Sequence, residues 1–157
     1  LSFSNAIQAA CSEFGAFHTM IGHSQGANAV LHASVKGVVS SRIVLLAPLV
    51  SVESHLRRAC ALVKLSAEGT ELFLRKITEL VGVPPSDFEG HVMGSTLNMR
   101  TLIVHDCRDK EVPISEAETL ANEMSLARLH ISDGLGHRRL LADLDTVNQV
   151  VSLMNET

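Results

Sequence analysis

Four short apolar runs separated by amphipathic helical patterns constrain the fold of this 157-residue chain more than any other feature. Strands that alternate with helices form a parallel sheet with the helices packed against it. The sequence therefore predicts an α/β fold, with a parallel sheet of about four strands and flanking helices. We expect strands at 16–21, 42–47, 100–105 and 128–132, and helices at about 4–14, 25–36, 115–126 and 138–154.

Two of the expected helices carry further signals. Ser115 and Glu118 have the spacing of a capping box at the start of helix 115–126. An apolar stripe at helical spacing follows it, formed by Ile114, Ala117, Leu120, Ala121 and Met124. The last helix has a similar stripe, formed by Leu140, Leu144, Val147, Val151 and Met154.

The stretch 51–97 is mostly helical in pattern and separates the second and third expected strands. Val83-Pro84-Pro85 ends one of its helices, because proline cannot continue a helix. We expect a helical, cap-like insertion within a single domain that covers residues 1–157. Two interpretations of the insertion stay open: a lid that lines an acyl or hydrophobic pocket, or ordinary packing of helices onto the sheet.

A Gly-x-Ser-x-Gly pentapeptide, residues 22–26, lies where the first strand pattern gives way to a helical one. On such a sharp turn the Ser24 hydroxyl is lifted clear of the sheet, and the next backbone N–H lies at the positive end of the helix. Glycines on either side relieve crowding where the chain folds back. The pentapeptide predicts a nucleophilic serine; a turn of small residues is the alternative.

A nucleophilic serine needs a base and an acid that orients the base. In a parallel sheet these groups lie on loops at the carboxyl ends of later strands. The third strand is followed by the loop 105–113, which contains Asp106 and Asp109, and the fourth by the loop 132–137, which ends on His137.

Three stretches of the sequence, in this order, resemble the α/β-hydrolase family. Gly22-His23-Ser24-Gln25-Gly26-Ala27 resembles its nucleophile elbow, 105–113 resembles its acid loop, and Gly134-Leu135-Gly136-His137 resembles its histidine loop. The resemblance implies that Ser24 is the nucleophile, Asp109 the acid and His137 the base. It also implies that the backbone N–H of Gln25 is one donor to the oxyanion.

The residues by themselves leave alternatives open for each partner. Asp106 is a rival acid because it is closer to the end of its strand, and Asp109 has a second interpretation as a turn or N-cap aspartate. His137 has a second interpretation as a loop histidine. His23 lies inside the elbow, where packing is as plausible as chemistry.

The handedness of parallel crossovers limits how the sheet is covered. Four strands added successively in one direction place every crossover helix on the same face, and only the terminal helix turns back to cover the other. The first strand, 16–21, would then have an open edge although its composition is that of a central strand. Together with the start at Leu1, this leads us to expect a partial domain that lacks the family's first four strands and the second oxyanion donor. The open edge predicts self-association or pairing with an N-terminal half.

Composition narrows the possible partners. A net charge of −4, five Phe and no Trp or Tyr argue against nucleic-acid binding. No run approaches the length of a membrane span, and no motif predicts a metal or another cofactor. Three widely spaced cysteines are typical of reduced thiols in the cytoplasm.

The function that these observations predict is that of a serine hydrolase. It would cleave a carboxylic ester or thioester of a small-molecule acyl substrate through an acyl-serine intermediate. Two alternatives remain: an acyltransferase that uses the same triad, and a non-catalytic or truncated α/β domain that pairs with another chain.

Overall fold

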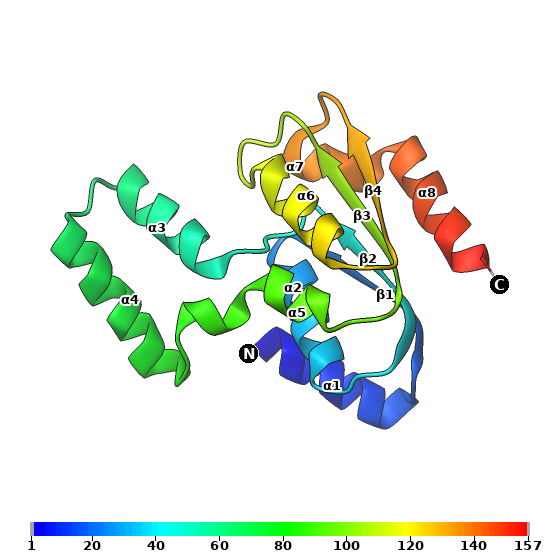
Figure 1. Cartoon of the computed structure of the whole chain (residues 1–157), viewed down its shortest axis with the longest axis horizontal. Coiled ribbons are helices and arrows are strands. Elements are labelled where there is room, and N and C mark those ends of the chain that lie inside the picture. The colour runs from blue at the N-terminus through cyan, green and yellow to red at the C-terminus, as the bar shows by residue number, and fades with distance from the viewer. Residues whose placement is uncertain (1, 157) are drawn as a thin grey trace.

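The computed structural model describes residues 2–156 and contains one parallel sheet of four strands (Figure 1). All neighbouring strands are parallel and follow one another in chain order across the sheet. The strands are β1 (Phe17–His23), β2 (Ser40–Leu46), β3 (Arg100–Asp106) and β4 (Ala127–Ser132). The predicted fold class, and each predicted strand to within a few residues, are confirmed.

Helices cover the two faces of the sheet unequally. One face packs against α1 (Ser2–Phe14), α2 (Gln25–Val35), α5 (Gly90–Ser95) and α6 (Ile114–Glu123). The other face packs against α7 (Gly136–Arg139), the 3₁₀ turn η2 (Leu140–Ala142) and α8 (Leu144–Asn155). This is the distribution that the handedness of the crossovers predicts.

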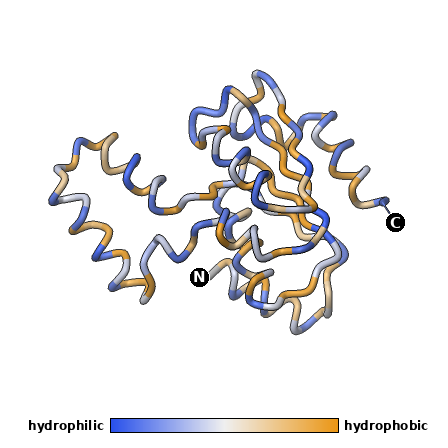
Figure 2. The backbone as a smooth tube through the Cα atoms, viewed as in Figure 1, coloured by the Kyte–Doolittle hydropathy of each residue, from blue (hydrophilic) through white to orange (hydrophobic). Residues whose placement is uncertain are grey.

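Alternate residues of the central strands supply two hydrophobic cores. In β2, Ile43 and Leu45 belong to the core beneath α2 and α6, whereas Val44 and Leu46 belong to the core beneath η2 and α8. Successive side chains of a strand point to opposite faces. Because both faces are covered here, residues 43–46 of β2 form a continuous apolar run (Figure 2).

The helices α3 (Val52–Leu62) and α4 (Ala67–Val81) stand away from the sheet (Figure 1). Each has only one buried residue, Cys60 in α3 and Leu74 in α4. A 3₁₀ turn, η1 (Pro85–Phe88), leads from α4 back to the sheet domain.

Glu116 of α6 fixes the base of α3. One carboxylate oxygen accepts hydrogen bonds from the N–H groups of Val50 and Ser51 at 2.7 and 3.0 Å, and the other accepts from Arg58 at 2.9 Å. The outer helices are therefore joined to the sheet domain by a partly buried polar contact rather than by a large apolar interface.

The predicted capping box at the start of α6 is wrong. The helix begins at Ile114 with Pro113 as its N-cap residue, and no side chain caps it. Proline has a backbone angle suited to the start of a helix. Ser115 is therefore already inside the helix, two residues after the N-cap position.

The last helix differs from its prediction in start and orientation. Asp143 interrupts the predicted helix 138–154, because its side chain accepts a hydrogen bond from the N–H of Thr146 and starts α8 anew. Thr146 and Leu153 are the buried residues of α8. Of the predicted stripe only Leu140 is buried; the exposed members are Leu144, Val147, Val151 and Met154, at 72%, 42%, 47% and 37%.

Strand β1 lies at one edge of the sheet, as predicted. Its Ile21 is 51% exposed. An apolar groove runs beside this edge, lined by residues of α1, β1 and α2. Within residues 2–156, no helix has both the length and the apolar character needed to cross a membrane.

Candidate functional site

The turn from β1 to α2 is tight and strained at Ser24. Ser24 has backbone angles of φ 55° and ψ −121°, a conformation that residues with side chains rarely adopt. Gly22 allows the turn because a Cβ at this position would lie 2.5 Å from the carbonyl oxygen of Gly26. The chain thus reverses within a few residues and presents the partly exposed serine at the carboxyl edge of the sheet.

Asp109 lies in the loop after β3, and its side chain is fully buried. Its Oδ1 accepts hydrogen bonds from the N–H groups of Glu111 and Val112, at 2.8 and 3.0 Å. Its Oδ2 lies 2.7 Å from Nδ1 of His137. Two backbone donors hold the carboxylate in place, so that it orients the imidazole.

The partner fixes the tautomer of His137. A carboxylate oxygen accepts, so Nδ1 of His137 carries the proton that is donated to Asp109. In the neutral ring Nε2 is then a free base. The imidazole is buried, and no described residue forms a hydrogen bond with its Nε2.

His23 connects this pair to the serine turn. Its Nε2–H donates to the backbone carbonyl of His137 at 2.9 Å, and the two imidazole rings lie 4.7 Å apart. Ser24 follows His23 directly in the chain, and its hydroxyl forms no hydrogen bond with any described residue. The structure therefore gives Ser24 and His137 a common neighbour.

A second imidazole lies against the buried carboxylate. Nε2 of His105 donates to the carbonyl of Val112 at 3.0 Å and lies 3.4 Å from Oδ2 of Asp109. The His105 side chain is fully buried, and its Nδ1 has no hydrogen-bond partner. No motif in the sequence indicates a role for His105, because it has no metal-ligand spacing to other histidines and lies at the end of a strand pattern.

Asp106, the rival acid, lies elsewhere and has another role. Its carboxylate accepts from the N–H groups of Arg108 and Leu135 and from the Ser132 hydroxyl, at 2.8–2.9 Å. Burial alone would raise the pKa of Asp106, but these bonds and one from the N–H of Gly136 lower it to about 2. Asp106 therefore ties the loop that contains His137 to the end of β3.

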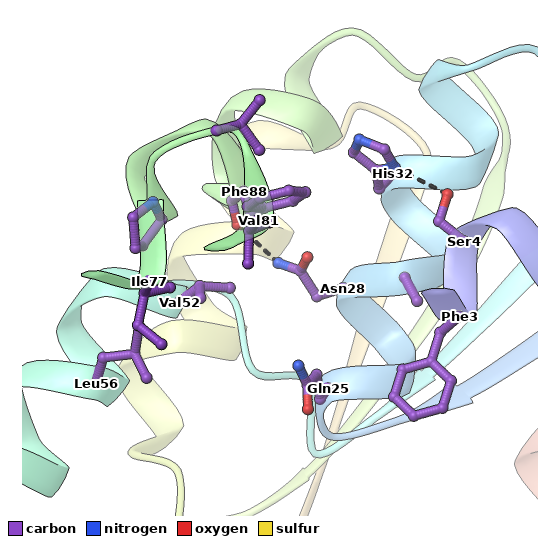
Figure 3. A pocket seen from close by; sticks show the side chains of 13 residues that line it. Phe3, Ser4, Gln25, Asn28, His32, Val52, Leu56, Ile77, Val81 and Phe88 are labelled. Atoms are coloured by element: carbon purple, nitrogen blue, oxygen red, sulfur yellow. Dashed lines mark hydrogen bonds between the residues drawn. The ribbon is translucent and has the colours of Figure 1, made fainter. Parts of the chain in front are cut away.

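An apolar cavity of about 260 Å³ lies next to the serine turn (Figure 3). It lies between α2 and the segment formed by α3, α4 and η1, and Gln25, the first residue of α2, is part of its wall. Its lining includes Val52, Leu56, Ile77, Val81 and Phe88, which all come from the helical segment 51–97.

Two polar side chains of α2 also line this cavity. Asn28 donates from its amide nitrogen to the carbonyl of Phe88 at 2.8 Å, and His32 shares a 2.8 Å hydrogen bond with the Ser4 hydroxyl. Burial, followed by the charge of Lys36, lowers the pKa of His32. No pattern in the sequence indicates a role for either residue, because their place in the cavity wall depends on where α3 and α4 lie.

No group of three or more His, Cys, Asp or Glu side chains in residues 2–156 is arranged to hold a metal ion. The first-turn N–H of Gln25 has no acceptor within the helix, as is usual at a helix start. The site thus contains a free hydroxyl, an imidazole oriented by a carboxylate, and a helix N-terminus.

Comparisons with known proteins agree on the fold. No family model matches the sequence, and no curated protein matches it. An esterase from Exiguobacterium antarcticum is similar in structure with a TM-score of 0.70 and 14% identity, over 98% of this chain and 72% of the esterase. An acetyl xylan esterase from Paenibacillus sp. R4 is similar with a TM-score of 0.67 and 21% identity. The match covers 97% of this chain and 51% of the esterase.

A monoacylglycerol lipase from Paleococcus ferrophilus gives a TM-score of 0.68 at 14% identity, over 98% of this chain and 74% of the lipase. The chain therefore spans between about half and three quarters of the length of these three proteins. Its strand order, its serine turn and its structural neighbours together identify its fold as that of the α/β-hydrolases.

Proposed function

We propose that the protein is a serine hydrolase that cleaves a carboxylic ester or thioester. The observation that carries the proposal is the 2.7 Å contact between His137 and the buried Asp109, which leaves Nε2 of the imidazole free as a base. Ser24 is the nucleophile in this proposal, His137 removes its proton, and Asp109 stabilises the imidazolium that forms.

The start of α2 is the proposed oxyanion site. When Ser24 attacks the carbonyl carbon, negative charge develops on the carbonyl oxygen. The N–H of Gln25, at the positive end of α2, is placed to stabilise this charge. Loss of one such donor typically lowers kcat by about 100- to 1000-fold. The leaving group then takes the proton from His137. Water next attacks the acyl-serine while His137 removes its proton, and His137 returns that proton to the Ser24 oxygen as the carboxylic acid leaves.

His105 is proposed as a positioning residue for the acid. Its N–H group points toward the carboxylate and the carbonyl of Val112. It thereby restricts the loop that holds Asp109, although it touches neither the serine nor a substrate. His23 acts in the same way on the backbone of His137.

The helical segment 51–97 is proposed to be a cap over the site. In support, its side chains form one wall of the cavity beside Gln25. Its few contacts with the sheet domain agree with a lid more than with ordinary helix packing. The cavity would then receive the apolar part of a small acyl substrate.

The open edge of β1 is proposed to pair with further strands, either from an N-terminal half or from a second copy. The half-exposed Ile21 and the apolar groove beside it support this proposal. The free state of all three cysteines, one of them exposed, supports a cytoplasmic location, where thiols stay reduced.

Labelling with a fluorophosphonate probe tests the proposed nucleophile, because the probe reacts only with an activated serine. We expect labelling of the protein and its loss in the Ser24→Ala variant, with kcat/KM for a p-nitrophenyl ester lowered by at least about 1000-fold. Ser12→Ala, an exposed serine on α1, is the matched control. Labelling that survives Ser24→Ala would contradict the proposal.

A further inference from the structure

The hydrogen bonds of Asn28 fix the orientation of its side-chain amide. Nδ2 donates to the carbonyl oxygen of Phe88 at 2.8 Å, and the carbonyl oxygen of Val50 lies 3.5 Å away. A carbonyl oxygen only accepts hydrogen bonds, so the atom that faces both must be the nitrogen. Oδ1 is therefore the end of the amide that does not face the backbone of the cap.

This oxygen has no hydrogen-bond partner among the described residues 2–156. Asn28 is only 5% exposed, and no residue in 2–156 donates a hydrogen bond to Oδ1. The side chain lines the cavity and extends from α2 toward Phe88 (Figure 3). Oδ1 keeps access to the cavity, so water satisfies it unless the donor of a ligand takes the place of that water. An unpaired acceptor in a cavity wall points to a ligand that donates.

Of the other polar side chains that line the cavity, Gln25 is exposed to solvent, whereas Ser4 and His32 satisfy one another. The Ser4 hydroxyl and Nδ1 of His32 are bonded to each other at 2.8 Å. Most other lining residues are apolar. A ligand that fits must therefore be mainly hydrocarbon, with one donor at the level of Asn28.

The position of Asn28 along α2 sets the place of that donor. Asn28 lies four residues after Ser24 on the same side of the helix, about 6 Å along the helix axis. A chain attached to a carbonyl at Ser24 and running along α2 passes Asn28 at roughly its third to fifth carbon.

We propose that the preferred substrate has an aliphatic acyl chain with a hydroxyl group near its third carbon, and that Asn28 determines this specificity by accepting the hydroxyl hydrogen bond. The inference rests on the proposed function, because it takes Ser24 as the point of attack. It assigns the cavity to the acyl side of the ester and not to the alcohol side.

Three N-acetylcysteamine thioesters test the proposal: octanoyl, 3-hydroxyoctanoyl and 3-methoxyoctanoyl. The methoxy group keeps the oxygen but cannot donate. We expect kcat/KM of the unmodified protein to be about three- to tenfold higher for one enantiomer of the hydroxyl substrate than for the other two, the size of a neutral hydrogen bond. Equal rates for hydroxyl and methoxy substrates would overturn the proposal without any variant.

Two substitutions of Asn28 distinguish the role of its acceptor oxygen from that of its donor nitrogen. Asn28→Asp keeps an oxygen acceptor but loses the donor to Phe88, and we expect it to retain the hydroxyl preference. Asn28→Leu keeps the size of the side chain without the acceptor, and we expect the preference to disappear. Asn148→Leu, an exposed asparagine of α8, is the control, and melting temperatures show whether each variant is folded. A preference that persists in folded Asn28→Leu would contradict the proposal.

Binding to the Ser24→Ala variant distinguishes failure of this inference from failure of the proposed function. Calorimetry with 3-hydroxyoctanoate and octanoate measures the cavity without turnover. Tighter binding of the hydroxy acid, by the same three- to tenfold, supports the role of Asn28 even if Ser24 proves not to be the nucleophile. Equal affinities would count against Asn28 even in an active serine hydrolase.

Discussion

At the scale of single residues, the two aspartates of the loop after β3 show how local geometry assigns roles. Asp106 and Asp109 are three residues apart, and both are buried. Asp106 is directed at the backbone of the histidine loop, whereas Asp109 is directed at the His137 ring itself. The strand fixes this difference, because Asp106 is its last residue and Asp109 follows after a turn.

The Asp106→Asn variant should be less stable at neutral pH by about 2–3 kcal/mol, since backbone donors then face an amide group that cannot satisfy them all. The pKa of Asp106 is about 2 in the folded protein, below its ordinary value of 3.8. Its contribution to stability is therefore complete above pH 4 and is lost as the pH falls toward 2. Urea unfolding of the parent and the variant at pH 7 measures the difference in stability, and the same experiment at pH 3 measures how much of that difference is lost. A difference between variant and parent that does not shrink at low pH would contradict this role.

At the scale of elements, caps decide where helices begin and which face they bury. The carboxylate of Asp143 accepts from the N–H of Thr146, so α8 starts six residues later than its apolar pattern suggests. The restart turns Thr146 and Leu153 toward the core and leaves Val147 and Val151 exposed. A periodic pattern identifies a helix but does not decide which stripe faces the sheet when two stripes are apolar.

The Asp143→Ala variant should lower the free energy of unfolding by about 1 kcal/mol, the usual value of an N-cap hydrogen bond. Thermal unfolding followed by circular dichroism measures the effect. Glu123→Ala, an exposed carboxylate at the end of α6, is the control. A melting temperature for Asp143→Ala equal to that of the control would show that the cap does not stabilise α8.

At the scale of the whole molecule, the two faces and edges of the sheet differ in how well they are covered. Four helices pack on one face, whereas α7, η2 and α8 alone pack on the other. Strand β1 has an open edge with Ile21 half exposed, and α8 presents Val147 and Val151 to solvent. Such unpaired edges and apolar surfaces favour association.

Residues 1–157 by themselves should therefore associate in solution. Sedimentation velocity between about 5 and 200 μM should give a mass that rises above that of one chain, because a sheet edge pairs by mass action. The Ile21→Lys variant should shift the equilibrium toward the monomer, since a charge on the edge strand opposes pairing. Leu62→Glu, on the exposed end of α3, is the control. A single-chain mass at every concentration would contradict the prediction.

The sequence by itself determined the order and type of the main elements. Apolar runs with helical patterns between them predict parallel strands. If these strands are added in one direction, crossover handedness leaves one face thinly covered and β1 lies at an edge, and the structure has this order. It also predicted the tight turn at Ser24, because glycine at position 22 is needed where backbones approach closely. These features depend on local sequence and on general rules of connection.

Only the tertiary structure decided which side chains meet. The choice between Asp106 and Asp109 as the neighbour of His137, the contact of His105 with Asp109, and the free oxygen of Asn28 depend on how loops and outer helices arrive from distant parts of the chain. A pattern of residues carries spacing along the chain, whereas a hydrogen bond of 2.7 Å depends on packing that every other element sets.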